Sequence, residues 1–253
     1  MEQFGVSGSE RDLFKYHIDY NDLPFEPHQE IFRRRNLIRS LSGVDAEVIL
    51  EIGCGRNSLF SEYEPPQSAI VVEPISDLLR MAKNGIANPA VSFFHGLMSE
   101  FVSAQEPETV DVAIASSLLH EMGDPQAFLS DCMKVLKPGG LFIAIVTNRN
   151  SIHRILGVAA GLQDDINSAT STEQLMQQLK GAYSSQTLSG ELESAGFKVE
   201  SCDSIFPKIL PHALMQRALD EEVINFDFLE KMDALMPFLS DFGSELLIRA
   251  RKP

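Results

Sequence analysis

Positively charged side chains are scarce in this sequence. Its 253 residues include 21 lysines and arginines against 36 aspartates and glutamates, which gives a formal net charge of -15 and a pI near 4.8. The resulting negative field repels a phosphate backbone, so we do not expect nucleic acid as a partner. One basic run, Arg33 to Arg35, falls in a helical-looking segment, and we interpret it as a solvated helix face rather than a phosphate site.

Cysteines and long apolar runs are also few. The three cysteines, Cys54, Cys132 and Cys202, are odd in number and lack metal-type spacing. Neither a disulfide framework nor a zinc site is therefore predicted, and a reducing cytoplasm is the expected setting. The carboxylates are scattered, so their spacing predicts no other metal site. No apolar run is long enough to span a bilayer, and the first residues lack the apolar segment of a signal peptide, so we expect no membrane association.

Short apolar runs alternate with helical patterns along the chain. With 44% hydrophobic residues, the chain can bury a sizeable core in one domain. Seven runs are predicted strands: the run that starts at Val48, then Ala69 to Val72, Val91 to Phe94, Val110 to Ala115, Leu141 to Val146, Phe197 to Ser201 and Glu245 to Ala250. Helix-like spacing marks Ile75 to Lys83, Pro125 to Leu136 and Gln186 to Ala195. Lys137 to Gly140 is predicted to end a helix and turn the chain. The alternation is typical of an α/β fold with a doubly wound, mostly parallel, Rossmann-like sheet.

Three segments do not follow this alternation, and we expect them to be mostly helical caps. We predict a single domain over residues 1–253, with its core at 44–147 and 186–205 and a last strand within 242–253. The caps are residues 1–43, 148–185 and 206–241. Parallel sheets bind ligands beyond the carboxyl ends of their strands, so segments inserted there are natural lids and substrate walls. Whether they instead complete the core or form the face of a homodimer stays open.

The segment from Val48 to Asn57 carries the clearest functional pattern. Its apolar residues indicate a buried strand, and Gly53 and Gly55 then allow a tight turn that can approach a bound molecule. Asn57 tolerates the left-handed backbone region that such a turn can use. Glu51 is a carboxylate near a buried strand end, where it needs a partner.

A second carboxylate, Glu73, ends the next predicted strand. It follows the glycine turn by roughly the 20 residues expected of a mononucleotide-binding half. There it can accept hydrogen bonds from both hydroxyls of a ribose; the alternative is an exposed strand-end glutamate. Both features also fit a nicotinamide-binding domain. The dinucleotide fingerprint, however, has its third glycine where this chain has Ser58, which disfavours an NAD-dependent oxidoreductase.

The segment from Glu51 to Gly55 resembles motif I of the class I S-adenosylmethionine (SAM) dependent methyltransferases, an acidic residue followed by two spaced glycines. Three later segments resemble further landmarks of that family in the same order: Asp111 to Asp124, Leu136 to Leu141 and Ala195 to Phe197. The resemblance implies SAM as the cofactor and S-adenosylhomocysteine (SAH) as its product. It also implies six parallel strands and an antiparallel seventh, Glu245 to Ala250.

The same resemblance implies a role for each matching residue. The backbone of the glycine turn would line the methionine part of SAM, Glu51 would order the turn and hold the amino group, and Glu73 would bind the ribose. Pro74, Leu97 and Met98 would form an apolar adenine pocket, in place of the acidic residue that the family often has at the end of the third strand. The implied cofactor-binding residues are Glu51, Gly53, Cys54, Gly55, Asn57, Glu73, Pro74, Leu97, Met98 and Ser116.

Methyl transfer requires an acceptor held in line with the methyl group, exclusion of water and a base if the acceptor is protonated. His120, just beyond the fourth strand, is the candidate catalytic base because its ordinary pKa lies near working pH. A structural role for this histidine stays open. Candidate acceptor-binding residues in the caps are Tyr16, Tyr20, His153 and His212, each with a structural role as the alternative.

Together, these features predict a cytoplasmic SAM-dependent methyltransferase that acts on a small molecule, with oxygen as the favoured methyl acceptor. The acidic charge and the helical caps favour a small molecule as the acceptor. Methylation of nitrogen or carbon, a protein substrate and a SAM-binding module without turnover remain alternatives, because one fold supports many chemistries. An NAD-dependent oxidoreductase is the least favoured reading.

Overall fold

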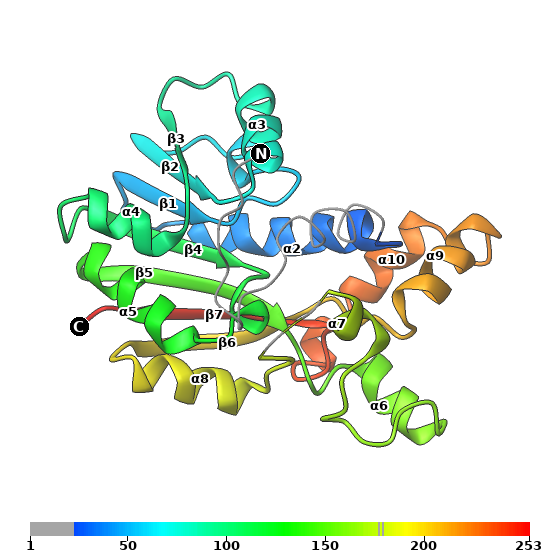
Figure 1. The fold of residues 1–253 in the computed structure, drawn as a ribbon. Coiled ribbons are helices and arrows are strands. Elements are labelled where there is room, and N and C mark those ends of the chain that lie inside the picture. Colours follow the sequence, from blue (N-terminus) through cyan, green and yellow to red (C-terminus); the bar gives the residue numbers. More distant parts are fainter. Residues whose placement is uncertain (1–22, 177, 179) are drawn as a thin grey trace, which may run out of the picture.

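The computed structural model describes residues 23–176, 178 and 180–253, so the predicted Tyr16 and Tyr20 lie outside the described residues. Its strands are β1 (Val48–Ile52), β2 (Ser68–Glu73), β3 (Val91–His95), β4 (Val110–Ser116), β5 (Leu136–Thr147), β6 (Lys198–Ile205) and β7 (Glu245–Arg251). They form one sheet in the order β3-β2-β1-β4-β5-β7-β6 (Figure 1). β7 pairs antiparallel with β5 and β6, and the other pairings are parallel. The predicted Rossmann-like sheet with an antiparallel last strand is confirmed.

Alternating side chains divide the core into two layers, one on each face of the sheet. In β1, Ile49 packs in one layer and Leu50 in the other, and in β4 Val112 and Ala113 divide in the same way. Burial on both faces explains why these central strands are nearly continuous apolar runs. The first layer is covered by α2 (Glu26–Leu41), α3 (Ser76–Gly85) and α10 (Phe226–Asp233), and the second by α4 (Met98–Ala104), α5 (Pro125–Val135) and α8 (Ser185–Ser194).

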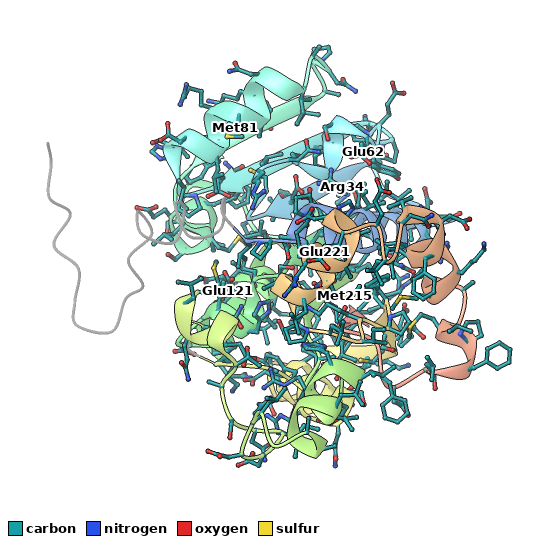
Figure 2. All side chains as sticks on the ribbon, turned by 90° about the vertical axis from the view of Figure 1, so that its right-hand side faces the viewer. Arg34, Glu62, Met81, Glu121, Met215 and Glu221 are labelled. Atoms are coloured by element: carbon teal, nitrogen blue, oxygen red, sulfur yellow. The ribbon has the colours of Figure 1, made fainter. Side chains whose placement is uncertain are left out.

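The remaining helices lie beyond the strand ends. They are α6 (Ile152–Ala159), α7 (Ser171–Leu175) and α9 (His212–Asp220), with short 3-10 turns η1 (Leu59–Ser61), η2 (Leu119–Glu121) and η3 (Met236–Phe238). Figure 1 shows α6, α7, α9 and α10 gathered on the side where the parallel strands end. Figure 2 looks onto that side, with Met215 and Glu221 of the α9 region in front of the sheet. The caps therefore stand over the edge at which open parallel sheets bind ligands.

The segment from Lys137 to Gly140 differs from the prediction. α5 ends at Val135, but β5 begins at the next residue, so the segment lies inside a strand rather than in a turn. The N–H of Gly139 donates to the carbonyl of Lys252, and the N–H of Lys252 donates to the carbonyl of Gly140, both at 3.0 Å. The register between β4 and β5 shifts there, and Gly139 adopts a φ of 75°. Hydrogen bonds to Lys252, which is distant in sequence, thus include the two glycines in the sheet, where they form a bulge-like irregularity of β5.

Candidate cofactor and acceptor site

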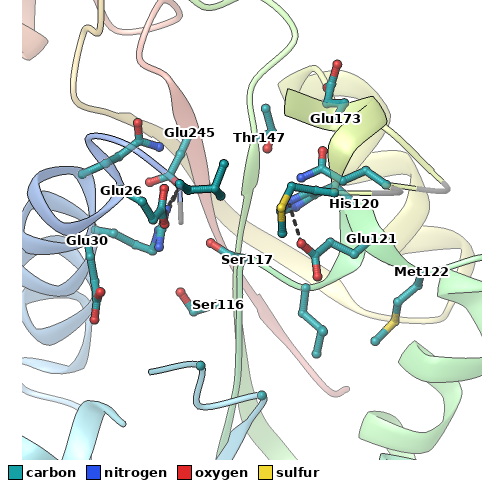
Figure 3. Close-up of a pocket in the computed structure, with 18 of the residues that line it drawn as sticks. Glu26, Glu30, Ser116, Ser117, His120, Glu121, Met122, Thr147, Glu173 and Glu245 are labelled. Carbon is teal, nitrogen blue, oxygen red and sulfur yellow. Dashed lines mark hydrogen bonds and ion pairs between the residues drawn. The ribbon is translucent and has the colours of Figure 1, made fainter. Parts of the chain in front are cut away.

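A cavity of about 1780 Å³ lies over the carboxyl ends of the strands. A usual small-molecule site measures roughly 300–1,000 Å³, so this cavity has room for two ligands. Figure 3 shows Glu26 and Glu245 on one side of it and His120 and Glu173 on the other. Every predicted site residue within the described part of the chain lines it: Glu51, Gly53, Cys54, Gly55, Asn57, Glu73, Pro74, Leu97, Met98, Ser116, His120, His153 and His212.

The sheet topology divides the cavity into two halves. The parallel strands β1, β2 and β4 bring Ile52, Glu73 and Ser116 to one edge of the sheet. β7 runs the opposite way, so its first residue, Glu245, pairs with Thr147 at the end of β5 and reaches the same edge. We call the part over β1, β2, β3 and β4 the glycine-turn half. The part over β5, β6 and β7, beneath the caps, is the cap half.

The turn after β1 has the backbone conformation that its glycines predict. Gly53 has a φ of 74° and Gly55 a φ of 57°, in the left-handed region where a side chain would be strained. Asn57 does not have a positive φ, so it does not adopt the left-handed conformation that the sequence allowed for it. Its carbonyl instead accepts a hydrogen bond from the Arg34 guanidinium, which also donates to the Ser58 carbonyl at 2.6 Å. Arg34 of α2 therefore fixes the end of the turn.

Glu51 is buried and finds its partners just after the turn. Its Oε1 accepts from the N–H of Leu59 at 2.8 Å, and its Oε2 accepts from the Ser58 hydroxyl. Burial raises the pKa of Glu51 to about 7, although these hydrogen bonds and Arg34 act in the opposite direction. The carboxyl group thus ties β1 to η1 and orders the turn.

Glu73 is 3% exposed at the end of β2, so the alternative of an exposed strand-end glutamate is wrong. Its Oε2 accepts from the N–H of Cys54 at 3.0 Å, and its Oε1 accepts from the N–H of Ile75 at 2.9 Å. Burial raises the pKa of Glu73, while backbone donors lower it. The Cys54 thiol also lies 3.6 Å from Oε2, and because a carboxylate has about four acceptor sites, Glu73 can still accept from a ligand in the cavity.

The chain after β2 and β3 forms the apolar wall of the glycine-turn half. Leu97 is 46% exposed and precedes α4, whereas Met98 is 6% exposed and belongs to the core layer under α4. His95 closes the top of this wall, with its Nε2 3.1 Å from the carbonyl oxygen of Pro74. Leu97 therefore offers more side chain to a ligand than Met98 does.

The end of β4 places two hydroxyls and an imidazole at the junction of the two halves. Ser116 and Ser117 lie between the two walls in Figure 3, and Ser117 adopts a φ of 57°. The Ser117 hydroxyl, which the sequence did not single out, is buried without a hydrogen-bond partner among the described residues. His120 is 4% exposed in η2, and its Nε2 lies 4.0 Å from Oε1 of Glu121. These two neighbouring side chains thus approach each other rather than point apart.

Buried charges that the sequence did not predict line the cap half. The Nη2 atom of Arg33 lies 2.9 Å from Oε1 of Glu26 and 2.6 Å from Oε1 of Glu245. Burial alone would raise the pKa of Glu26, but Arg33 and His212 lower it to about 2. Arg33 therefore joins α2 to the first residue of β7 through Glu245, while Glu26 of α2 contacts the same guanidinium.

Our interpretation of Arg33 to Arg35 as a solvated helix face is wrong for two of the three residues. Arg33 and Arg34 are 7% and 9% exposed and line the cavity. Arg35 is the partly exposed member, and it pairs with Glu230 of α10 at 2.7 Å. Because α2 lies between the sheet and the caps, its polar positions are covered as well as its apolar ones.

Lys208 and two histidines complete the cap half. Lys208 is 2% exposed, and its Nζ lies 3.1 Å from Oε1 of Gln29 and 3.1 Å from Nδ1 of His212. Burial lowers the pKa values of His153 and His212, and the neighbouring Lys208 adds to that effect. The sequence pointed to both histidines as candidate site residues but not to Lys208. The position of Lys208 among apolar residues, in a loop bounded by prolines, was a signal that it could be buried.

A second buried ion pair lies across the cap half. Nη1 of Arg154 in α6 is 2.9 Å from Oε1 of Glu173 in α7, and both side chains are nearly inaccessible to solvent. Nothing in the sequence near either residue distinguishes it from a surface charge. The pair joins two cap helices and encloses the cavity.

Residues 50–144 match a family model described as a methyltransferase domain. Together with the sheet order, this match identifies the matched part of the chain. Residues 50–144 form a class I SAM-dependent methyltransferase domain. A ubiquinone biosynthesis O-methyltransferase from Idiomarina loihiensis is 29% identical over 121 residues, which are 47% of this chain and 49% of that protein. The chain spans about half the length of the curated relatives it matches.

Solved structures share the fold of the methyltransferase domain and its caps. Phosphoethanolamine N-methyltransferase 2 from Haemonchus contortus, solved in complex with SAM, superposes with a TM-score of 0.62 at 15% identity, covering 95% of this chain and 56% of that one. A SAM-dependent methyltransferase from Mesorhizobium loti gives a TM-score of 0.59 at 15% identity, covering 87% and 97%. At these identities the likeness establishes the fold.

The glycine-turn half of the methyltransferase domain fits SAM, the cofactor of this family. Gly53 and Gly55 bring backbone close to the cavity, and the buried Glu73 can accept hydrogen bonds from a diol. Acidic side chains, Glu73 and Glu121 among them, line this region, and an ionised carboxylate there suits a sulfonium cation. In the described residues, no group of three or more His, Cys, Asp or Glu side chains could hold a metal ion. No helix among them is long and apolar enough to cross a membrane.

Proposed function

We propose that this protein transfers a methyl group from SAM to an oxygen atom of a small-molecule acceptor. The observation that supports this most is a single cavity that runs from the glycine turn and Glu73 to a cap half with buried polar walls. Its volume of about 1780 Å³ suits a cofactor and an acceptor together. The relative named as an O-methyltransferase supports oxygen as the methylated atom.

The cofactor, when bound, supplies the activated methyl group. In this proposal the glycine turn and Glu51 hold the methionine part, Glu73 binds the ribose, and Pro74 and Leu97 pack on the adenine. The caps hold the acceptor and exclude water, so the acceptor oxygen can be positioned in line with the methyl group. The protein therefore contributes mainly orientation.

His120 would take the proton from the acceptor hydroxyl. It lies at the junction of the two halves, where an acceptor oxygen would meet the methyl group. The carboxylate of Glu121, 4.0 Å away, would stabilise the imidazolium that forms. A neutral imidazole at the start of the reaction suits this role, because it can accept a proton near pH 7.

Replacing His120 with glutamine tests that role. We expect kcat to fall by about 10²- to 10⁴-fold, the usual contribution of a positioned base, while the affinity for SAH stays unchanged. The acidic limb of the pH–rate profile, in which a general base becomes protonated and inactive, should move or disappear with the substitution. His28→Gln is the matched control, since His28 does not line the cavity and should leave kcat within about twofold. A fall in kcat no larger than that of the control would assign His120 a structural role.

Calorimetric titration with SAM, SAH and NAD tests the proposed function as a whole. Binding of both adenosyl ligands without binding of NAD is the expected result. A radiolabelled methyl-transfer screen over phenols and alcohols, with amines for comparison, then identifies the acceptor atom. Binding of NAD alone would overturn the proposal, and tight SAM binding without turnover of any acceptor would favour a binding module.

A further inference from the structure

Lys208 differs from the other described cations that line the cavity. Arg33, Arg34 and Arg154 each have a carboxylate oxygen within 2.9 Å. No carboxylate among the described residues lies within 4.0 Å of the Lys208 ammonium group, although the group is 2% exposed. Glu26 and Glu245 favour the charged form of Lys208 from a distance, but both carboxylates contact Arg33, so a direct ion pair of the buried ammonium is left to a ligand.

The hydrogen bonds of Lys208 leave one donor for that ligand. An ammonium has three N–H donors, and two of them are directed at Oε1 of Gln29 and Nδ1 of His212. Because Nδ1 of His212 accepts, its Nε2 carries the hydrogen and faces Oε2 of Glu26 at 3.5 Å. The histidine is therefore neutral and satisfied by its neighbours. Nζ of Lys208 also lies 3.4 Å from Nε2 of the same imidazole, but a nitrogen that carries the hydrogen cannot accept, so one donor of the ammonium is left for a ligand.

His153 provides a second unused polar group in the same region. Its Nδ1 is buried without a hydrogen-bond partner among the described residues, and it lines the cavity. Lys208 is close enough to lower the pKa of His153, together with burial. A neutral imidazole can donate from Nδ1, so the ammonium and the imidazole can hold two oxygens of one ligand group.

We propose that Lys208 and His153 bind a carboxylate group carried by the methyl acceptor. This inference rests on the proposed function, which it narrows to acceptors that are carboxylic acids. The two oxygens of a carboxylate match one ammonium donor and one imidazole donor. A phosphate dianion would add a second negative charge near Glu26, Glu173 and Glu245, which line the same half.

The fold separates this carboxylate site from the cofactor site. Lys208 follows β6, which is the edge strand on the far side of β4, β5 and β7 from β1. Four strand spacings of about 4.8 Å separate β1 from β6 at the edge of the sheet. The carboxylate of SAM, held near the glycine turn, is therefore a separate ligand group, and loss of Lys208 is expected to leave the affinity for SAH unchanged.

The test is calorimetric titration of the SAH-saturated protein with benzoate and with benzamide, its uncharged analogue. We expect benzoate to bind at least tenfold more tightly than benzamide, since a hydrogen bond to a charged group contributes about 1.5–3 kcal/mol, or roughly 10- to 100-fold. Lys208→Met keeps an unbranched apolar side chain and removes the ammonium group, and the variant should bind both ligands with the weak affinity of benzamide. The matched control is Lys231→Met, because the Lys231 side chain is 73% exposed in α10 and should not affect either ligand.

A pH series on the wild-type protein gives a second readout that needs no variant. Burial lowers the pKa of Lys208 to about 8, so its charge is lost above that pH and benzoate should bind about tenfold more weakly at pH 9 than at pH 7. The ionisable groups that face Lys208 are Glu26, Arg33, His153, Arg154, His212 and Glu245. The pKa values of both histidines are lowered and that of Glu26 is about 2, so these three groups keep their charge state between pH 7 and 9, and arginine stays protonated.

The outcomes separate this inference from the proposed function. Equal affinity for benzoate and benzamide, absence of benzoate binding, or wild-type benzoate affinity in Lys208→Met would each overturn the carboxylate site. A loss of SAH affinity in Lys208→Met would assign the lysine to the cofactor and overturn it as well. Absence of SAH binding to the wild-type protein would instead overturn the proposed function.

Discussion

Replacing Glu73 with alanine is expected to weaken SAH binding by at least about 100-fold, which corresponds to roughly 2.7 kcal/mol. The buried carboxylate would accept hydrogen bonds from both ribose hydroxyls, and each hydrogen bond to a charged group contributes about 1.5–3 kcal/mol. It also accepts the N–H of Cys54 at 3.0 Å, so the same substitution removes a support of the glycine turn. Titration of purified protein with SAH measures the combined effect.

Glu73→Gln distinguishes the two contributions. Glutamine keeps one acceptor oxygen for the backbone of the turn but cannot accept from two hydroxyls in the same way. We expect its thermal midpoint to stay near that of the wild type while SAH affinity falls by about tenfold or more. Glu64→Ala, at an exposed position after η1, is the control for loss of one negative charge. Wild-type affinity in both Glu73 variants would remove the ribose role and leave a structural carboxylate.

The sheet and the glycine-turn half could be predicted because their signals are local. The run from Val48 to Ile52, the following Gly53 and Gly55, and the strand that ends at Glu73 lie close together in the sequence. Their spacing alone brings a backbone turn and a carboxylate to the same edge of a parallel sheet. The prediction of a turn at Lys137 to Gly140 was wrong because its signal was not local. The hydrogen-bond partner of this segment, Lys252, comes from the end of the chain.

The cap half could not be predicted because its charges meet only in the folded chain. Arg33, Lys208 and Glu245 come from α2, the loop after β6 and the start of β7. Each is an ordinary charged residue in its own segment, and no short-range pattern shows that it will be buried. Burial of Arg33 depends on which faces of α2 the sheet and the caps cover, and this is a property of tertiary packing. The available signals were weak: Glu245 is a charged residue at the first position of the last strand, and Lys208 stands among apolar residues in a proline-bounded loop.

Replacing Arg33 with methionine is expected to lower the free energy of unfolding by about 3–5 kcal/mol at pH 7. The substitution leaves the carboxylates of Glu26 and Glu245 buried, 6% and 4% exposed, without the guanidinium between them. Urea denaturation measures the loss. Arg35→Met is the matched control in the same helix, because its partly exposed pair with Glu230 should contribute no more than about 1 kcal/mol. Equal losses in the two variants would show that the buried network is no stronger than a surface pair.

The pH dependence of this loss follows from Glu26. In the wild type its pKa is about 2, below the ordinary value of 4.5, so it contributes stability above pH 4.5 that is lost as the pH falls toward 2. Without Arg33, burial dominates and raises the pKa of Glu26, so the variant is penalised most at neutral pH and least in acid. The difference in unfolding free energy between wild type and Arg33→Met should therefore shrink from pH 7 to pH 4. Arg33 also joins α2 to the start of β7, and both line the proposed acceptor site. The loss of unfolding free energy in Arg33→Met therefore also measures how much this link stabilises the wall of that site.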